Sequence, residues 1–225
     1  MAETLEINGI VLSSMPVGEA DRRLSILTKE LGRISCFARG ARKPTSALIS
    51  ATRPFATGKF HIYPGKDSYS LNRVEISEHF ESIVSDVAAT AYGSYFLELA
   101  TRFSTEHYDG GEMLYLLYYA LKALTNPQIP NRLVRRIFEL RVLKNEGVAP
   151  EFTERSKLPD GKQMQKSTAY ALNYVETTPV GKLFSFNVTE EVLREMEAVL
   201  RKLMDRNLDR PTKSQELLEI LAEDA

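Results

Sequence analysis

The sequence has few of the residues that form disulfide bonds or bind metal ions. Its 225 residues include one cysteine, Cys36, and three histidines, His61, His79 and His107. A single cysteine cannot form an internal disulfide bond, and none of the histidines lies at a usual zinc-ligand spacing from it. We therefore expect no structural metal and no other cofactor.

Long hydrophobic runs are also missing. The first six residues are acidic and lack the basic start and apolar stretch of a signal peptide, and nowhere do about 18 apolar residues follow one another. The composition, 43% apolar and 26% charged, is ordinary for a folded soluble protein. We expect a protein of the reducing cytoplasm without a membrane partner.

Charge is distributed unevenly along the chain. The net charge of −1 divides into +3 for residues 1–80 and −4 for residues 81–225. All eleven lysines and arginines of the first part lie between Arg22 and Arg73, where the only acids are Glu30 and Asp67, so this window has a net charge of about +9. A surplus of this size attracts a polyanion.

The first third of the chain has the pattern of short β-strands. Five segments are rich in β-branched and aromatic residues, and several alternate apolar with polar side chains: residues 7–14, 24–28, 33–39, 55–63 and 69–76. Between the second and third, Gly32 can supply the positive φ of a tight hairpin turn. Five strands in so short a stretch predict a small closed β-barrel over residues 1–80.

Beyond residue 80 the apolar pattern is helical. We predict helices from a cap at Ser85 or Asp86 to about residue 103, over 112–124, over 132–144 with Asn131 as cap, over 189–204, and from Pro211 to about 221. We interpret the polar, helix-poor stretch at 147–170 as a long irregular segment on the surface. The expected fold is a two-domain α+β protein with a five-stranded barrel at 1–80 and an all-α domain at 81–225.

The loop after the third strand is the most informative segment. Residues 39–46 hold Arg39, Arg42 and Lys43, and Gly40 and Pro44 interrupt regular structure. Lysine and arginine neutralise phosphates and release counterions, and aromatic side chains stack on the bases of single strands. Five aromatic residues lie nearby, although alternation places some of them in the core: Phe37, Phe55, Phe60, Tyr63 and Tyr69. The two interpretations are a nucleic-acid-binding loop and an ordinary solvated surface.

Candidate catalytic residues have simpler explanations. Cys36 lies in an alternating strand, where a lone cysteine is usually a small core residue. Glu19 and Asp21 flank a turn, where local ion pairs and turn hydrogen bonds account for them. The sequence at 107–111, from His107 to two glycines, fits a turn between helices. We therefore expect no catalytic site and no enzymatic activity.

One helix carries four arginines close to one face. Arg132, Arg135, Arg136 and Arg141 recur at helical spacing, and apolar residues supply the opposite face. Two interpretations remain open. The arginines form ion pairs with neighbours such as Glu139, or they bind an anion or an acidic peptide.

The order of motifs resembles a known family. Residues 10–12 (IVL), 18–23 (GEADRR), 27–33 (LTKELGR) and 38–42 (ARGAR) look like the N-terminal half of the bacterial recombination mediators called RecO. Residues 208–214 (LDRPTKS) resemble the end of the same family, so the resemblance reaches both ends of the chain.

The resemblance implies an OB-fold barrel followed by a helical domain, associated with the nucleoid. It implies binding of single- and double-stranded DNA, annealing of complementary strands, and loading of RecA, together with RecR, onto DNA coated by the single-stranded DNA-binding protein SSB. Many members carry a four-cysteine zinc site in the helical domain, but residues 147–174 contain no cysteine. The acidic tail of SSB would contact the arginines of 132–141.

These arguments give a specific set of DNA-binding residues, all within the basic window. They are Arg22, Arg23, Arg33, Arg39, Arg42, Lys43, Arg53 and Lys59. Two alternative functions remain. One is a protein-interaction scaffold whose basic barrel recognises an acidic protein or a membrane surface, and the other is an enzyme that uses the barrel to dock on nucleic acid.

Overall fold

The computed structural model describes residues 4–106, 108–153 and 155–223. These residues form two compact units. The barrel unit extends to Glu81 and also contains Leu97–Leu114, and the helical unit comprises Ser82–Phe96 and the chain from Tyr115 onward.

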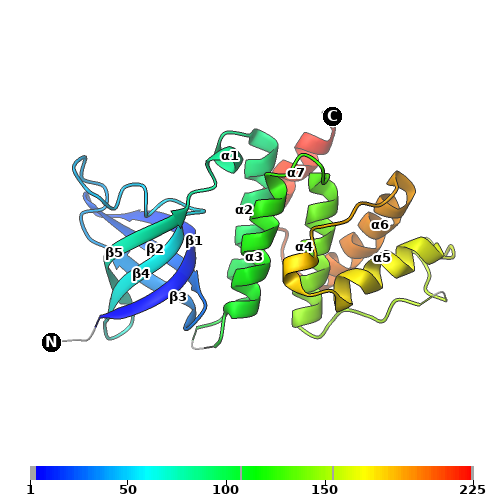
Figure 1. Ribbon diagram of the computed structural model, residues 1–225, viewed down its shortest axis with the longest axis horizontal. Helices are drawn as coiled ribbons and strands as arrows, with labels where there is room; N and C mark the ends of the chain where they lie inside the picture. The colour runs from blue at the N-terminus through cyan, green and yellow to red at the C-terminus, as the bar shows by residue number, and fades with distance from the viewer. Residues whose placement is uncertain (1–3, 107, 154, 224–225) are drawn as a thin grey trace. The chain divides into compact units, whose positions relative to one another are not determined.

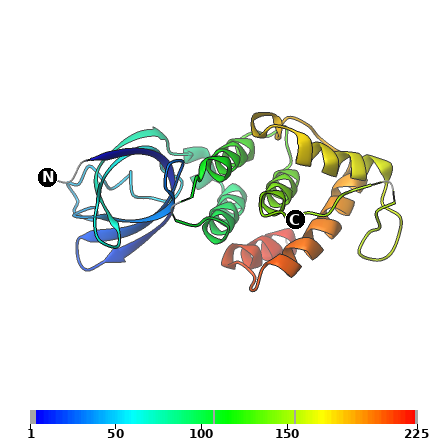
Figure 2. The same ribbon diagram turned by 90° about the horizontal axis from the view of Figure 1, so that it is seen from below.

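Five strands of the barrel unit close into a barrel, as predicted (Figures 1 and 2). They are β1 (Leu5–Val17), β2 (Asp21–Thr28), β3 (Gly32–Ala38), β4 (Thr57–Pro64) and β5 (Tyr69–Glu78). Around the barrel the order is β1-β2-β3-β5-β4, and only the short β3–β5 pairing is parallel among the described strands. The expected OB-fold barrel, and with it the two-part α+β fold class, is confirmed.

Alternate side chains of the strands point into the barrel and form its core. In β3 the side chains of Ile34, Cys36 and Ala38 are buried inside, while the residues between them face outward. The strand begins at Gly32, which adopts a φ of +65° directly after the hairpin turn. The sequence around Gly32 predicted this positive φ. The Thr28 hydroxyl accepts from the Leu31 N–H and donates to the Gly32 carbonyl, which closes the turn.

The segment between β3 and β4 is a series of turns that packs against the barrel. Ala41, Ala51 and Phe55 are buried, and the N–H of Phe55 donates to the Val11 carbonyl at 3.1 Å. Phe55 has a φ of +72°, which is not a strand conformation. The strand predicted to begin at Phe55 therefore begins at Thr57.

The helical unit is built on three mutually packed helices, α4 (Asn131–Asn145), α5 (Lys166–Thr177) and α6 (Glu190–Asn207). The remaining helices are α1 (Glu81–Val84), α2 (Val87–Arg102), α3 (Gly111–Leu124), the 3₁₀ turn η1 (Val180–Lys182) and α7 (Lys213–Glu223). α2 and α3 each run from one unit into the other. Within the described residues, every helix is too short or too polar to cross a membrane.

Two local expectations about the helices were wrong. Asn131 is the first residue of α4 and Pro130 is its cap, without a side-chain hydrogen bond. The irregular stretch ends at residue 165, because α5 begins at Lys166, and this helix was not predicted. Its buried positions include Thr168, Ala169 and Ala171, whose small or polar side chains give little apolar periodicity.

Packing and a small hairpin hold the stretch at 147–165. Lys157 bridges to Gln163 around a turn in which Gly161 has a φ of +87°. Phe152 and Met164 are buried as anchors. The stretch has no cysteine, and the described residues contain no group of three or more metal-ligating side chains, so the four-cysteine zinc site that the resemblance suggested does not fit this chain.

Candidate nucleic-acid interface

Strand pairing brings most of the candidate cations to one end of the barrel. Arg22 pairs with Ala38 and Arg23 with Phe37 across β2 and β3, so the start of β2 lies beside the end of β3. Arg39 follows Ala38 directly. We call the resulting group the basic end; it consists of Arg22, Arg23, Arg39, Arg42 and Lys43.

Hydrogen bonds fasten the loop of the basic end to the β1–β2 turn. The N–H of Gly40 donates to Asp21 Oδ1 at 2.7 Å. The N–H of Arg42 donates to the Ala20 carbonyl at 2.8 Å, and its Nη1 donates to the Gly18 carbonyl at 2.9 Å. The loop that carries Arg42 therefore has a fixed backbone. All the cations of the basic end are exposed except Arg22, which is half-buried and donates to Ser14 Oγ.

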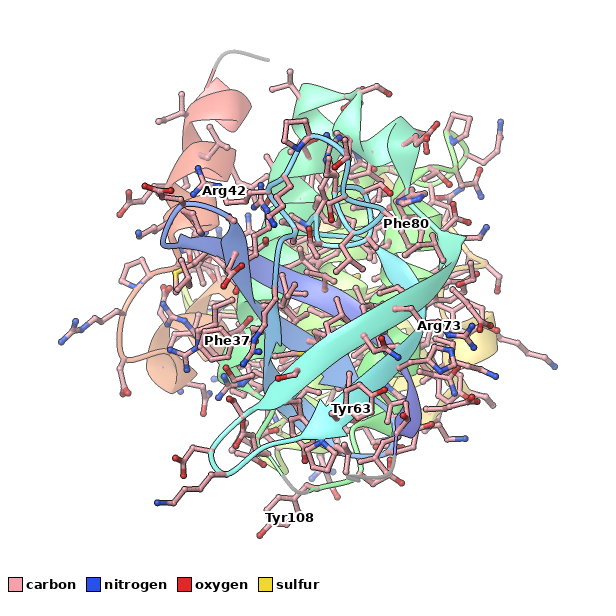
Figure 3. All side chains as sticks on the ribbon, turned by 90° about the vertical axis from the view of Figure 1, so that its left-hand side faces the viewer. Phe37, Arg42, Tyr63, Arg73, Phe80 and Tyr108 are labelled. Carbon is pink, nitrogen blue, oxygen red and sulfur yellow. The ribbon has the colours of Figure 1, made fainter. Side chains whose placement is uncertain are left out.

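A row of outward-facing side chains runs from the basic end across the barrel. Successive cross-strand pairs join Met15 to Arg23, Arg23 to Phe37, Phe37 to Ser70 and Ser70 to Tyr63. We call these five residues the outer row. Figure 3 shows its two aromatic members, Phe37 and Tyr63, with the barrel facing the viewer.

The side chains of the outer row are held by their neighbours. The Arg23 guanidinium carbon lies 5.9 Å from the centre of the Phe37 ring, within cation–π range, and Arg23 Nε donates to Ser35 Oγ at 2.9 Å. Asn72 Nδ2 donates to the Tyr63 hydroxyl at 3.4 Å. Because the row depends on strand register, sequence reasoning missed Met15, Ser70 and the grouping itself.

The five candidate aromatic residues separate into inner and outer sets. Phe55 and Phe60 are buried, and Tyr69 is half-buried against the barrel core. Phe37 is half-buried on the outside, and 38% of Tyr63 is exposed. Only Phe37 and Tyr63, among these five, therefore have ring surface on the outside of the barrel beside the candidate cations.

Three candidate cations lie outside the basic end. Arg53 is exposed in the turn that precedes Phe55. Arg33 is half-buried, and its Nε donates to the Ser104 carbonyl at 3.0 Å. Lys59 Nζ lies 3.5 Å from a carboxylate oxygen of Glu6. The structure therefore does not bring Arg33 or Lys59 into one surface with the others.

Acids just outside the basic window reduce its effective charge. Pairing of β4 with β1 and β5 brings Glu6 and Glu75 to opposite sides of buried His61, whose ring nitrogens lie 3.4 and 2.9 Å from these carboxylates. The hydrogen bond from His61 and the charge of Arg73 lower the pKa of Glu75. Figure 3 shows Arg73 and Arg42 on opposite sides of the barrel, so these ion pairs are separate from the basic end.

Of the residues considered for catalysis, Cys36, Asp21 and Asp109 have structural roles. Cys36 is fully buried in the barrel core, and burial raises the pKa of its thiol to about 12, which leaves it unreactive. Asp21 holds the loop of the basic end, as described above. Asp109 accepts from the Gly111 N–H where α3 begins, and His107 lies outside the described residues.

The four arginines of α4 are engaged inside the helical unit. Arg132 donates to Glu197 and Glu190 of α6, while Arg135 and Arg136 both donate to Glu139. Of the two interpretations left open by the sequence, ion pairing with Glu139 is the one observed for Arg135 and Arg136.

The fourth, Arg141, is buried and donates to the carbonyls of Val175, Glu176 and Thr178 at the end of α5. Arg136 is buried as well. The four guanidinium groups therefore do not form one exposed cationic surface.

A closed barrel of this strand order, with cations and aromatic rings on its outside and a helical unit after it, defines a two-part protein of the OB-fold class. The family model for the N terminal of recombination protein O matches residues 1–80, and the model for its C terminal matches 84–158 and 154–216. The chain belongs to the recombination protein O family.

Individual relatives agree with this assignment. The chain is 28% identical to the DNA repair protein RecO of Acetivibrio thermocellus over 92% of each chain. It is 28% identical to the RecO of Clostridium acetobutylicum, over 96% of this chain and 97% of the relative. A shorter match to the RecO of Heliobacterium modesticaldum is 36% identical and covers 64% of this chain and 52% of the relative. The family resemblance expected from the motifs is confirmed.

Proposed function

We propose that this protein is a non-catalytic mediator of recombinational DNA repair that works on the nucleoid in the cytoplasm. It binds single- and double-stranded DNA at the basic end of the barrel and anneals complementary strands. With RecR, it helps to load RecA onto DNA coated by SSB. Membership of the recombination protein O family supports the repair role.

The observation that carries the proposal is the fixed basic loop. Arg39, Arg42 and Lys43 lie on a backbone held to the β1–β2 turn by hydrogen bonds from Gly40 and Arg42. Because the backbone is already ordered, contact with phosphates costs little further backbone entropy, and the contacts release condensed counterions. The resulting affinity is independent of sequence and falls as salt rises.

Annealing follows from the same electrostatics. Two DNA strands repel each other, and a cationic surface that holds both strands lowers the free energy of their encounter. Contacts with SSB and RecR are proposed from the family alone, since the arginines of α4 are engaged by Glu139, Glu190, Glu197 and the end of α5.

A fluorescence anisotropy titration tests the DNA site. The variant Arg39→Glu/Lys43→Glu reverses two exposed cations of the basic end, and Lys29→Glu/Arg73→Glu reverses two exposed cations elsewhere on the barrel. We expect the first variant to bind oligonucleotides of unrelated sequence at least about tenfold more weakly, with a shallower salt dependence. The second variant changes net charge equally and should retain the wild-type slope.

Equal effects of the two variants would reject the basic end as the site. Feeble binding by the wild-type protein at moderate salt would favour a scaffold that recognises an acidic protein or membrane surface. Strand-annealing rates measured with and without SSB on the strands then test the partner contact. A protein that anneals bare strands but not SSB-coated strands would contradict the mediator role.

A further inference from the structure

We propose that Phe37 and Tyr63 make the outer row selective for unpaired bases, so that the barrel distinguishes single strands from duplex by stacking rather than by charge. This inference rests on the proposed function, because it assigns a substrate class to the same surface. Neither the family match nor the basic end implies it, since cations contact the phosphates of single and double strands alike.

The geometry of the two rings carries the argument. Phe37 on β3 and Tyr63 on β4 are both paired with Ser70 on β5, so a single strand carrying a small side chain separates them. Two strand spacings amount to about 10 Å. Stacked bases along one strand of a duplex are about 3.4 Å apart and have no free faces, so the interior of a duplex cannot place bases on both rings. A flexible single strand with unstacked bases can do so.

The surroundings of the rings suit a stacking role. Phe37 is half-buried and has Arg23 within cation–π distance, and Tyr63 is steadied by the hydrogen bond from Asn72. Rings that are already positioned lose little entropy when a base stacks on them. Arg23 also belongs to the basic end, so the row joins a phosphate-binding group directly to the first ring.

The experiment compares a short fluorescent oligonucleotide with its own blunt duplex in anisotropy titrations at one salt concentration. Phe37→Leu and Tyr63→Leu keep apolar bulk and remove the aromatic face. Each should weaken single-strand binding by about tenfold, the effect of losing one stacked base, and change duplex binding by less than about twofold. Tyr63→Phe should keep most of the single-strand affinity.

The matched control is Tyr108→Leu. Tyr108 is 72% exposed in the barrel unit and is not part of the outer row (Figure 3). The Tyr108→Leu variant should bind single strands and duplex with the affinities of the wild-type protein. A further measurement uses an oligonucleotide containing 2-aminopurine, whose fluorescence changes on stacking. Binding of the wild-type protein should change this fluorescence. Binding of the Phe37→Leu/Tyr63→Leu variant should leave it unchanged.

The outcomes separate this inference from the proposed function. Equal losses on single strands and duplex, or unchanged single-strand affinity in both leucine variants, would overturn the stacking role while DNA binding stands. Absence of binding to either DNA form by the wild type would overturn the proposed function itself. A selective loss on single strands with an unchanged salt slope supports the stacking role.

Discussion

The backbone N–H of Gly40 donates a 2.7 Å hydrogen bond to the carboxylate of Asp21, so an acid holds the most basic loop of the barrel in place. Two effects of this acid oppose each other. Its negative charge weakens the local positive potential, whereas its hydrogen bond fixes the backbone that carries Arg42 and Lys43. A substitution at Asp21 therefore distinguishes a site that depends on preorganisation from one that depends only on net charge.

We expect Asp21→Ala to lower the free energy of unfolding by about 1.5 kcal/mol, since a half-buried N–H loses a charged acceptor. DNA affinity should stay level or fall, although the barrel becomes more positive. The control is Glu19→Ala, an exposed acid in the same turn with the same change of charge, which should tighten binding slightly. Urea unfolding and anisotropy titration measure the two effects. Equally tightened DNA binding by both variants would contradict preorganisation.

Among the described residues of the helical unit, Glu139 is the most deeply buried charged group. It is fully buried and accepts from the Tyr95 hydroxyl at 2.7 Å, from Arg135 Nε at 2.8 Å and from Arg136 Nη1 at 2.6 Å. Burial alone would raise its pKa, but the charges of Arg136 and Arg135 and the hydrogen bond from Tyr95 outweigh burial, and the pKa is lowered. The burial of Tyr95 and the nearby Glu139 charge raise the pKa of that phenol.

The lowered pKa of Glu139 fixes the sign of its pH effect. Because its folded pKa lies below the ordinary value of 4.5, its contribution to stability is complete above about pH 4.5 and is lost as the pH falls through the folded pKa. Glu139→Gln leaves two arginines without their carboxylate and should cost about 3–5 kcal/mol near pH 7. Urea unfolding followed by circular dichroism at several pH values measures this cost.

Tyr95→Phe is the milder companion, since it removes one donor and keeps both ion pairs, and it should cost about 1–2 kcal/mol. The stability difference between Glu139→Gln and the wild type should narrow as the pH falls below 4.5. A difference that stays constant down to acid unfolding would rule out the charge of Glu139 as its source.

The barrel and most helices were predictable because local patterns determine them. Alternation in β3 identified the buried side of Cys36, and the turn sequence identified the positive φ of Gly32. Helix α6 was predicted over 189–204 from its apolar stripe; in the structure Thr189 is its cap, and its side chain accepts from the Val192 N–H. The short helix α5 has weaker local signals, since no side chain caps it and three of its buried positions, Thr168, Ala169 and Ala171, are small or polar.

The candidate site was only partly predictable, because charge along the chain differs from charge in space. Lys59 and Arg33 both belong to the basic window. Lys59 forms an ion pair with Glu6 on a paired strand, and Arg33 donates to the carbonyl of Ser104, which is distant in sequence. The outer row could not be predicted from the sequence either, because its residues come together only through strand pairing. The pairing of Phe37 and Tyr63 with Ser70 depends on strand register and on the parallel contact of β3 with β5, which no local pattern encodes.

Gly32 and Gly18 both adopt positive φ angles, but only one is enclosed by the backbone. A Cβ on Gly32 would lie 2.2 Å from the Thr105 carbonyl oxygen, whereas no atom lies within 4 Å of a Cβ on Gly18. Gly18→Ala should therefore cost only the backbone strain, about 1 kcal/mol. Gly32→Ala must also displace the chain that packs on the hairpin and should cost about 3 kcal/mol or more. Thermal and urea unfolding of the two variants compare these costs, and equal losses would mean that the segment at Thr105 yields freely and does not brace the barrel.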